Sequence, residues 1–163
     1  HTECRHRSLV NLPIVDIRIF NYFSHTQDMD ASFFITDVVR AIRNKTVLKT
    51  SAHNILRDFI GPDDFYQLIN AILKSKPAND VVDCYSKEPI DKFGLLKSME
   101  ENFSLKYSIE SFFTSVNATG EKINYYSSNK RAEIFGYIPS LTSLMNIEKE
   151  CEIILNHTGI LLN

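Results

Sequence analysis

Glycine and cysteine are scarce in this sequence, and each scarcity excludes a class of site. Only five of the 163 residues are glycine, and they form no glycine-rich loop of the dinucleotide-binding or P-loop type. The three cysteines, Cys4, Cys84 and Cys151, lie far apart without a CxxC pair, which argues against a disulfide framework and a zinc site. We expect reduced, buried thiols in a cytoplasmic protein.

An excess of one charge and a long apolar run are also missing. The 18 basic and 20 acidic residues are spread along the chain, so no basic patch for nucleic acid stands out. No apolar stretch approaches the roughly 18 to 20 residues that a membrane span needs. We therefore predict a soluble chain with neither nucleic acid nor membrane as a partner. With 44% hydrophobic residues, residues 1–163 can form a single domain around one core.

Periodic apolar residues predict alternating strands and helices. Val15, Ile17 and Ile19 alternate with polar residues, which is typical of a half-buried strand within 14–22. The other expected elements are a helix over 32–45 capped by Ser32, short extended segments at 46–50 and 54–60, a helix from 62, a strand at 81–86, a helix from about 89 to 103, a strand at 105–113, a polar loop at 114–124, a serine-capped short helix within 127–139 and a helix from about 143 to 155. This order predicts an α/β or α+β fold with too few long parallel strands for a complete doubly wound domain.

The helix after residue 61 has the clearest start signal. Gly61 precedes Pro62 at the first helical position, and Asp63 and Asp64 oppose the positive end of the helix dipole. We therefore interpret the two carboxylates as dipole partners rather than as an acid–base pair. Later in the chain, Gly136 is expected to end the short helix.

No self-sufficient catalytic set is visible. Cys4 with His1 or His6 could be drawn as a nucleophile and a base, but a reactive thiolate needs an electropositive pocket that a sequence does not show. The five histidines lack the spacing of a metal site. We predict no catalytic residue and no metal site in this chain.

Arg57 has two interpretations. It follows a short apolar run where a predicted strand meets a loop. Its guanidinium keeps its charge and offers a planar fork of donors that suits a phosphate. The alternative is a surface arginine that pairs with Asp58 or Asp63. The residues alone leave both interpretations open.

Four stretches, in order along nearly the whole chain, carry a family resemblance. They are LPIVDIRIFNYFS (12–24), LRDFIGPDDFYQLINAIL (56–73), VVDCYSKEPIDKFGLLKSMEENFSL (81–105) and INYYSSNKRAEIFGYIPSLTSLMNIEKECEIIL (123–155). Together they resemble the extended short-chain dehydrogenase/reductase superfamily, the NAD(P)-dependent nucleotide-sugar epimerases and dehydratases. The resemblance implies an α/β fold: the C-terminal, substrate-binding part of such an enzyme, with the last strand or strands of a truncated Rossmann sheet.

The resemblance also implies what lies outside this chain. Glu3 matches a glutamate that follows the family's Tyr-x-x-x-Lys on the catalytic helix. Residues 1–24 are then the expected remnant of that helix and of a Rossmann strand. The chain itself is expected to lack the Tyr-x-x-x-Lys and glycine-rich motifs, and to be inactive alone. The full-length protein is expected to be a homodimer, with exposed apolar residues around Leu9 and Val10.

Five residues receive roles from the resemblance. Phe20 and Asn21 match strand-end residues that pack near the nicotinamide of NAD or NADP, and Asn21 also binds the sugar nucleotide. Val47 and Leu48 belong to a short strand that flanks the nucleotide base. Arg57 matches an arginine that contacts the diphosphate or ribose of a nucleotide-diphosphate sugar. Asn21 and Arg57 are therefore expected to face one shared cleft.

The sequence also departs from the family pattern. Ser24 stands where the family has a glycine, while Ser127 and Asn129 replace an aspartate and a serine of the closing motif. A second family arginine is absent near 117–120. These departures leave the substrate open. They also keep an alternative, a non-catalytic binding or interaction domain of the same fold.

Overall fold

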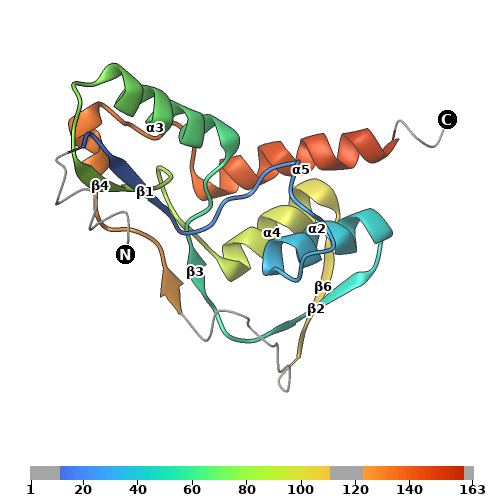
Figure 1. Ribbon diagram of the computed structural model, residues 1–163. Coiled ribbons are helices and arrows are strands. Elements are labelled where there is room, and N and C mark those ends of the chain that lie inside the picture. The colour runs from blue at the N-terminus through green and yellow to red at the C-terminus, as the bar shows by residue number, and fades with distance from the viewer. Residues whose placement is uncertain (1–11, 111–122, 160–163) are drawn as a thin grey trace.

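The computed structural model describes residues 12–110 and 123–159. Its elements, in chain order, are β1 (Val15–Ile19), α2 (Phe34–Asn44), β2 (Val47–Ser51), β3 (Leu56–Arg57), α3 (Pro62–Lys74), β4 (Asp80–Cys84), β5 (Ile90–Asp91), α4 (Lys92–Phe103), β6 (Lys106–Glu110), β7 (Asn124–Tyr125), the 3₁₀ helix η1 (Arg131–Phe135) and α5 (Ser143–Gly159) (Figure 1). The predicted α/β class is confirmed.

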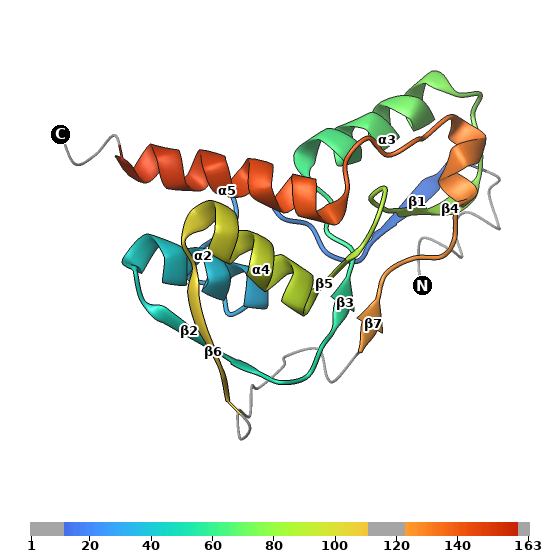
Figure 2. The same ribbon diagram turned by 180° about the vertical axis from the view of Figure 1, so that it is seen from behind.

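The strands form three small sheets. β1 pairs in parallel with β4, and β2 pairs in parallel with β6. β3 lies between β5, which is antiparallel to it, and β7, which is parallel. The β1–β4 pair lies beside α3, whereas the β2–β6 pair lies beside α2 and α4, and α5 runs alongside those two helices (Figure 1, Figure 2). Strand β3 connects the two regions.

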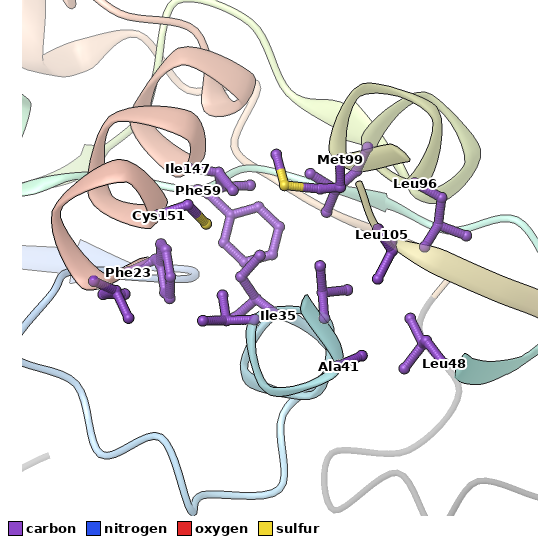
Figure 3. Packing of buried hydrophobic residues seen from close by; sticks show 14 residues of the cluster. Phe23, Ile35, Ala41, Leu48, Phe59, Leu96, Met99, Leu105, Ile147 and Cys151 are labelled. Atoms are coloured by element: carbon purple, nitrogen blue, oxygen red, sulfur yellow. The ribbon is translucent and has the colours of Figure 1, made fainter. Parts of the chain in front are cut away.

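The larger core cluster lies where α2, α4 and α5 meet β2 and β6. Side chains from all three helices point toward one another there (Figure 3). Helix α2 contributes Ile35, Val38 and Val39, at the i, i+3 and i+4 positions of an amphipathic helix, and α5 contributes Ile147 and Cys151 one turn apart. The other buried members are Phe23, Ala41, Leu48, Phe59, Leu95, Leu96, Met99, Leu105 and Ile154. The hydrophobic burial that holds this region together is therefore shared by elements from residue 23 to residue 154.

A second cluster packs β4 against α3 and η1. Its buried members are Ile60, Leu68, Val82, Cys84, Tyr85, Ala132 and Tyr137. The Tyr137 hydroxyl donates a hydrogen bond to the Tyr85 carbonyl at 2.6 Å, so the buried phenol keeps a partner. Burial raises the pKa of the Cys84 thiol to about 12, and that of Cys151 likewise to about 12. Both thiols are buried as predicted, and Cys4 lies outside the described residues.

Two predicted caps are wrong. The N-cap of α2 is Phe33 rather than Ser32, and the Phe33 N–H donates to Thr36 Oγ1 at 3.1 Å. The short helix is a 3₁₀ helix whose N-cap, Lys130, makes no side-chain cap hydrogen bond. Its end is as predicted, because Gly136 adopts φ +80°, a left-handed conformation that favours glycine.

Helix α4 begins at Lys92, later than the predicted start near Pro89. The Asp91 carboxylate accepts hydrogen bonds from the backbone N–H groups of Phe93 at 3.0 Å and Gly94 at 3.1 Å. This N-cap fixes where the helix starts. Asp91 and the residue before it, Ile90, form β5 and pair with β3.

Strand β7 overlaps a segment predicted to be a loop, 114–124. A two-residue strand leaves no periodic pattern, so pairing with β3 is visible only in three dimensions. The last residues of the predicted strand at 105–113 lie outside the described part of the chain, and the described part is β6.

Candidate functional site

Asn21 and Arg57 lie on two neighbouring segments that run side by side. The Ile60 N–H donates to the Asn21 carbonyl and the Phe23 N–H donates to the Ile60 carbonyl, each at 3.0 Å. The Asn21 side chain continues this contact, because its Nδ2 donates to the Asp58 carbonyl at 3.0 Å. The end of β1 is thus held directly against the residue that follows Arg57.

Arg57 is fixed at its base within the three-stranded sheet. It is in register with Ile90 on β5 and Tyr125 on β7, so these three side chains lie on the same face. Its Nη1 donates to the carbonyls of Leu56 at 2.9 Å and Ile123 at 3.1 Å. Burial lowers the pKa of Arg57, and Tyr125 opposes that shift. An arginine keeps its charge at neutral pH in either case.

Phe20 completes this group. Its ring meets the ring of Tyr125 edge to face, with 5.0 Å between the centroids. The structure therefore brings together Phe20 and Asn21 from the end of β1, Arg57 from β3 and Tyr125 from β7. Sequence reasoning missed Tyr125, because its short strand carries no periodic signal. The shared cleft for Asn21 and Arg57 stays a prediction.

Val47 and Leu48 point in opposite directions from β2. Leu48 is 9% exposed and belongs to the larger core cluster, while Val47 is 54% exposed. The Leu48 side chain could contact a ligand only if it left the core. The Leu48 backbone and the exposed Val47 side chain could contact a ligand without any such change. Their substrate-binding role stays a prediction.

The start of α4 holds the loop that leads from β2 to Arg57. Lys92 is almost fully buried, and its Nζ donates to the carbonyl of Ser51 and to its hydroxyl at 3.3 Å. The Lys92 N–H donates to the Ile55 carbonyl at 2.9 Å. Burial lowers the pKa of Lys92 from its ordinary value. These bonds fix both ends of the loop before β3 and so help to set the position of Arg57.

The carboxylate next to Arg57 is buried and joins three elements. Asp58 accepts hydrogen bonds from the Ser86 N–H at 3.2 Å and from the Ser143 hydroxyl at 3.0 Å. The same Ser143 oxygen accepts the Phe59 N–H at 2.9 Å. This network ties the strand of Arg57 to the segment after β4 and to the start of α5.

Asp64 is a second buried carboxylate, and it lies in the first turn of α3 as the sequence predicted. It accepts hydrogen bonds from the N–H and the hydroxyl of Ser140, both at 2.9 Å, and from Asn146 Nδ2 at 3.3 Å. Its neighbour Asp63 lies at the surface and pairs with Lys149. Because Asp58 and Asp63 have these other partners, the structure gives no support to the alternative in which they hold Arg57.

A Tyr-x-x-x-Lys spacing does occur in the chain, contrary to the prediction that it is lacking. Tyr126 and Lys130 have this spacing, but they lie in the irregular segment between β7 and η1 rather than on a helix. A helix brings residues four apart onto one face one turn apart, and this irregular segment does not. The Lys130 Nζ lies 3.6 Å from the centroid of the Tyr85 ring. This pair therefore does not reproduce the catalytic arrangement of the family.

The described residues, 12–110 and 123–159, contain neither a metal-binding group nor a membrane-spanning helix. No group of three His, Cys, Asp or Glu side chains there is arranged to hold a metal ion. None of the helices in that part of the chain combines the length and apolarity that crossing a membrane requires.

The fold of this chain is similar to that of the C-terminal region of extended short-chain dehydrogenase/reductase enzymes. No protein-family model matches the chain, and no curated protein matches it in sequence. Solved structures do match. They include UDP-glucuronic acid 4-epimerase from Bacillus cereus in complex with UDP-glucuronic acid and NAD (TM-score 0.76, 19% identity, 95% of this chain and 49% of that one).

Two further epimerases are also similar in fold. UDP-N-acetylglucosamine 4-epimerase from Bacillus cereus has a TM-score of 0.71 at 13% identity, over 93% of this chain and 50% of that chain. UDP-glucose 4-epimerase from Thermotoga maritima, solved with UDP-glucose, has a TM-score of 0.76 at 12% identity, over 98% and 50%. The chain spans about half the length of these proteins. At this identity the likeness shows the fold.

Proposed function

We propose that this chain is the nucleotide-sugar-binding part of an NAD(P)-dependent enzyme that epimerises, dehydrates or reduces a nucleotide-diphosphate sugar. The observation that carries the proposal is that the two family positions lie on adjoining segments: Asn21 Nδ2 donates to the carbonyl of Asp58, the residue that follows Arg57. The solved structures similar in fold include enzymes in complex with UDP-sugars and NAD, which supports the same substrate class.

Each residue has a distinct role in this proposal. The Arg57 guanidinium binds the diphosphate through its fork of donors, and Asn21 offers a donor and an acceptor to the sugar nucleotide. Val47 and Leu48 flank the nucleotide base. Phe20 packs beside the nicotinamide ring of the cofactor. Parallel strands place ligands at their carboxyl ends, which is where Phe20 and Asn21 follow β1.

The cofactor fits this chain only in part. When bound, NAD(P) would accept a hydride from the sugar. The sequence contains no glycine-rich loop for the cofactor's diphosphate, so this chain's own contribution is limited to orienting the nicotinamide end through Phe20 and Asn21. In this proposal, the general base and the site for the cofactor's diphosphate are supplied by residues outside this chain.

The small size of the β1–β4 sheet supports the proposal of an additional half. Among the described residues, β1 and β4 form a two-stranded parallel sheet, and Leu12, Arg18 and Ile19, before and within β1, are exposed. A parallel sheet is ordinarily covered on both faces. We propose that a nucleotide-binding half extends this sheet. Glu3, Leu9 and Val10, on which the catalytic-helix and homodimer expectations rest, lie outside the described residues, so those expectations and the cytoplasmic location stay predictions.

A thermal-shift panel tests the proposal. The full chain is heated with UDP-, dTDP-, GDP- and CDP-sugars, and at least one is expected to raise the melting temperature, because a ligand that binds only the folded state stabilises it. Arg57→Ala should abolish the shift. Arg131→Ala, which removes an exposed arginine paired with Asp80, should retain it. A shift that survives Arg57→Ala, or no shift with any sugar nucleotide, contradicts the proposal.

The second candidate is a non-catalytic binding or interaction domain of the same fold. The absence of a catalytic set in the sequence favours it. The coding sequence upstream of residue 1 distinguishes the two: a Tyr-x-x-x-Lys just before residue 1 supports the enzyme, and its absence supports the binding domain.

A further inference from the structure

A cavity of about 710 Å³ lies at the opposite end of β2 and β6 from the Arg57 group. It is lined by the ends of α2 and α4 and by the residues that lead from them into the two strands, such as Thr46 and Lys106. In Figure 1 and Figure 2 this is the end where α2 passes into β2 and α4 into β6. Its volume is within the range of about 300 to 1,000 Å³ that is typical of small-molecule sites.

The floor of this cavity is apolar. Ile42, Phe103 and Leu155, from three different helices, all line it. Each of them also packs against the larger core cluster. The floor is therefore a rigid extension of the core and offers a hydrophobic surface to a ligand.

The rim of the cavity is cationic. Arg43, Lys45 and Lys106 line it, and no aspartate or glutamate does. Within the described residues, no carboxylate forms an ion pair with any of these three side chains, whereas Lys49 on β2 pairs with Glu110 on β6 at 2.9 Å. Arg43 lies in the last turn of α2 and Lys45 is its C-cap, where cations also complement the helix dipole, but Lys106 is the first residue of β6.

The connection from α2 to β2 and the connection from α4 to β6 share one backbone feature. Lys45 and Ser104 are the C-caps of α2 and α4, and they adopt the left-handed conformation with φ 54° and φ 58°. Residues other than glycine seldom adopt this conformation. Here it turns each chain sharply from helix into strand, so that both connections line the cavity.

We propose that this cavity binds a small organic anion with an apolar body, of the alkyl or aryl carboxylate class. The apolar body lies on Ile42, Phe103 and Leu155, and the carboxylate is held by Lys45 and Lys106 with Arg43 beside them. A ligand without the apolar body would not contact the apolar side chains, and a ligand without the carboxylate would not pair with the cations. The site is separate from Arg57 and does not depend on the function proposed above.

A matched set of probes tests this site. The full chain is titrated with 4-phenylbutyrate, its neutral analogue 4-phenylbutan-1-ol, and acetate, while the backbone amide signals of Thr46 and Ser104 are followed by NMR. We expect saturable shifts with 4-phenylbutyrate and much weaker ones with the alcohol and acetate. No saturable shift with 4-phenylbutyrate, or equal binding of the alcohol, overturns the proposal.

Charge-removing variants locate the binding. Lys45→Gly with Lys106→Gln removes two rim cations, and glycine suits the left-handed backbone at position 45, so the fold should be retained. This variant should bind 4-phenylbutyrate at least about tenfold more weakly, which is the loss expected for hydrogen bonds to charged groups. Lys76→Gln with Lys87→Gln removes the same charge at exposed positions elsewhere and should bind normally. Unchanged binding by the first variant, or equal loss in both, overturns the proposal.

Discussion

The region around the β2–β6 pair and the region around the β1–β4 pair differ in how completely other elements cover their strands. Around the β2–β6 pair, three helices pack on one another and leave a continuous apolar core. Around the β1–β4 pair, α3 and η1 cover the second cluster, yet β1 and β4 form a sheet of only two strands among the described residues and Ile19 is 38% exposed. The first region has the packing of a self-sufficient body. The second has that of a sheet that continues into another part, as proposed above.

The largest expected difference between the regions is in the cost of removing an apolar side chain. Ile147→Ala in the larger core should destabilise the chain by roughly 2 to 5 kcal/mol, because it deletes a fully buried side chain and leaves a cavity. Ile19→Ala on the edge strand should cost only about 1 kcal/mol, since its side chain is already partly in water. Urea unfolding measures both. Similar losses would show that the two regions do not differ in closure.

A second expected effect concerns the junction between the regions. Asp58→Ala removes the acceptor for the Ser86 N–H and the Ser143 hydroxyl in a buried site, and should cost about 2 to 3 kcal/mol. The control is Asp63→Ala, which removes a surface ion pair with Lys149 and a helix-dipole partner and should cost at most about 1 kcal/mol. Equal free energies of unfolding for the two variants would mean that the buried network is not what joins the regions.

A third test uses the close approach of the Asn146 side chain to Gly61 at the junction. A Cβ added to Gly61 would lie 2.5 Å from Asn146 Oδ1, so Gly61→Ala should destabilise by about 1 to 3 kcal/mol. In the double variant with Asn146→Ala, the space is released and the two losses should be less than additive. Additive losses in urea unfolding would contradict a steric contact between these positions.

These contacts show what the sequence could and could not predict. The periodic elements were found because their apolar spacing is local: β1 from Val15 and Ile17, and α2 from Val38 and Val39. The family positions Phe20, Asn21 and Arg57 also came from the sequence, through the resemblance, and the structure brings them close together. Their roles remain proposals.

The buried polar contacts and the strand β7 could not be predicted, because the residues that pair in them are remote from one another in the sequence. Asp58 meets Ser143 across 85 positions, and Asp64 meets Asn146 across 82. The local pattern placed Asp64 in the first turn of α3, where it lies, but did not show its bonds to a distant segment. The β7 strand is two residues long and is defined only by its pairing with β3. In the sequence, Asp58 lies between Arg57 and Phe59, and Asp64 lies between Asp63 and Phe65, so neither position carries a local signal of burial.

The smallest effect is at the start of α4 and depends on pH. Hydrogen bonds from the Gly94 N–H, and also from the Phe93 N–H, lower the pKa of Asp91 below its ordinary value. The stabilisation from this cap is therefore present above about pH 4, the ordinary carboxyl range, and is lost as the pH falls through the lower folded value. Asp91→Ala should cost about 1 kcal/mol at pH 7 and progressively less below pH 4. A cost that does not change with pH would contradict this assignment.

The central claim is that Asn21 and Arg57 act on one nucleotide-diphosphate sugar. Calorimetric titration of the wild type, Asn21→Ala, Arg57→Lys and the double variant, with the sugar nucleotide that gives the largest thermal shift, measures this directly. We predict that each single variant weakens binding about tenfold or more, since charged and buried hydrogen bonds are lost, and that the two effects are not additive. Affinities equal to the wild type in both single variants would contradict the account.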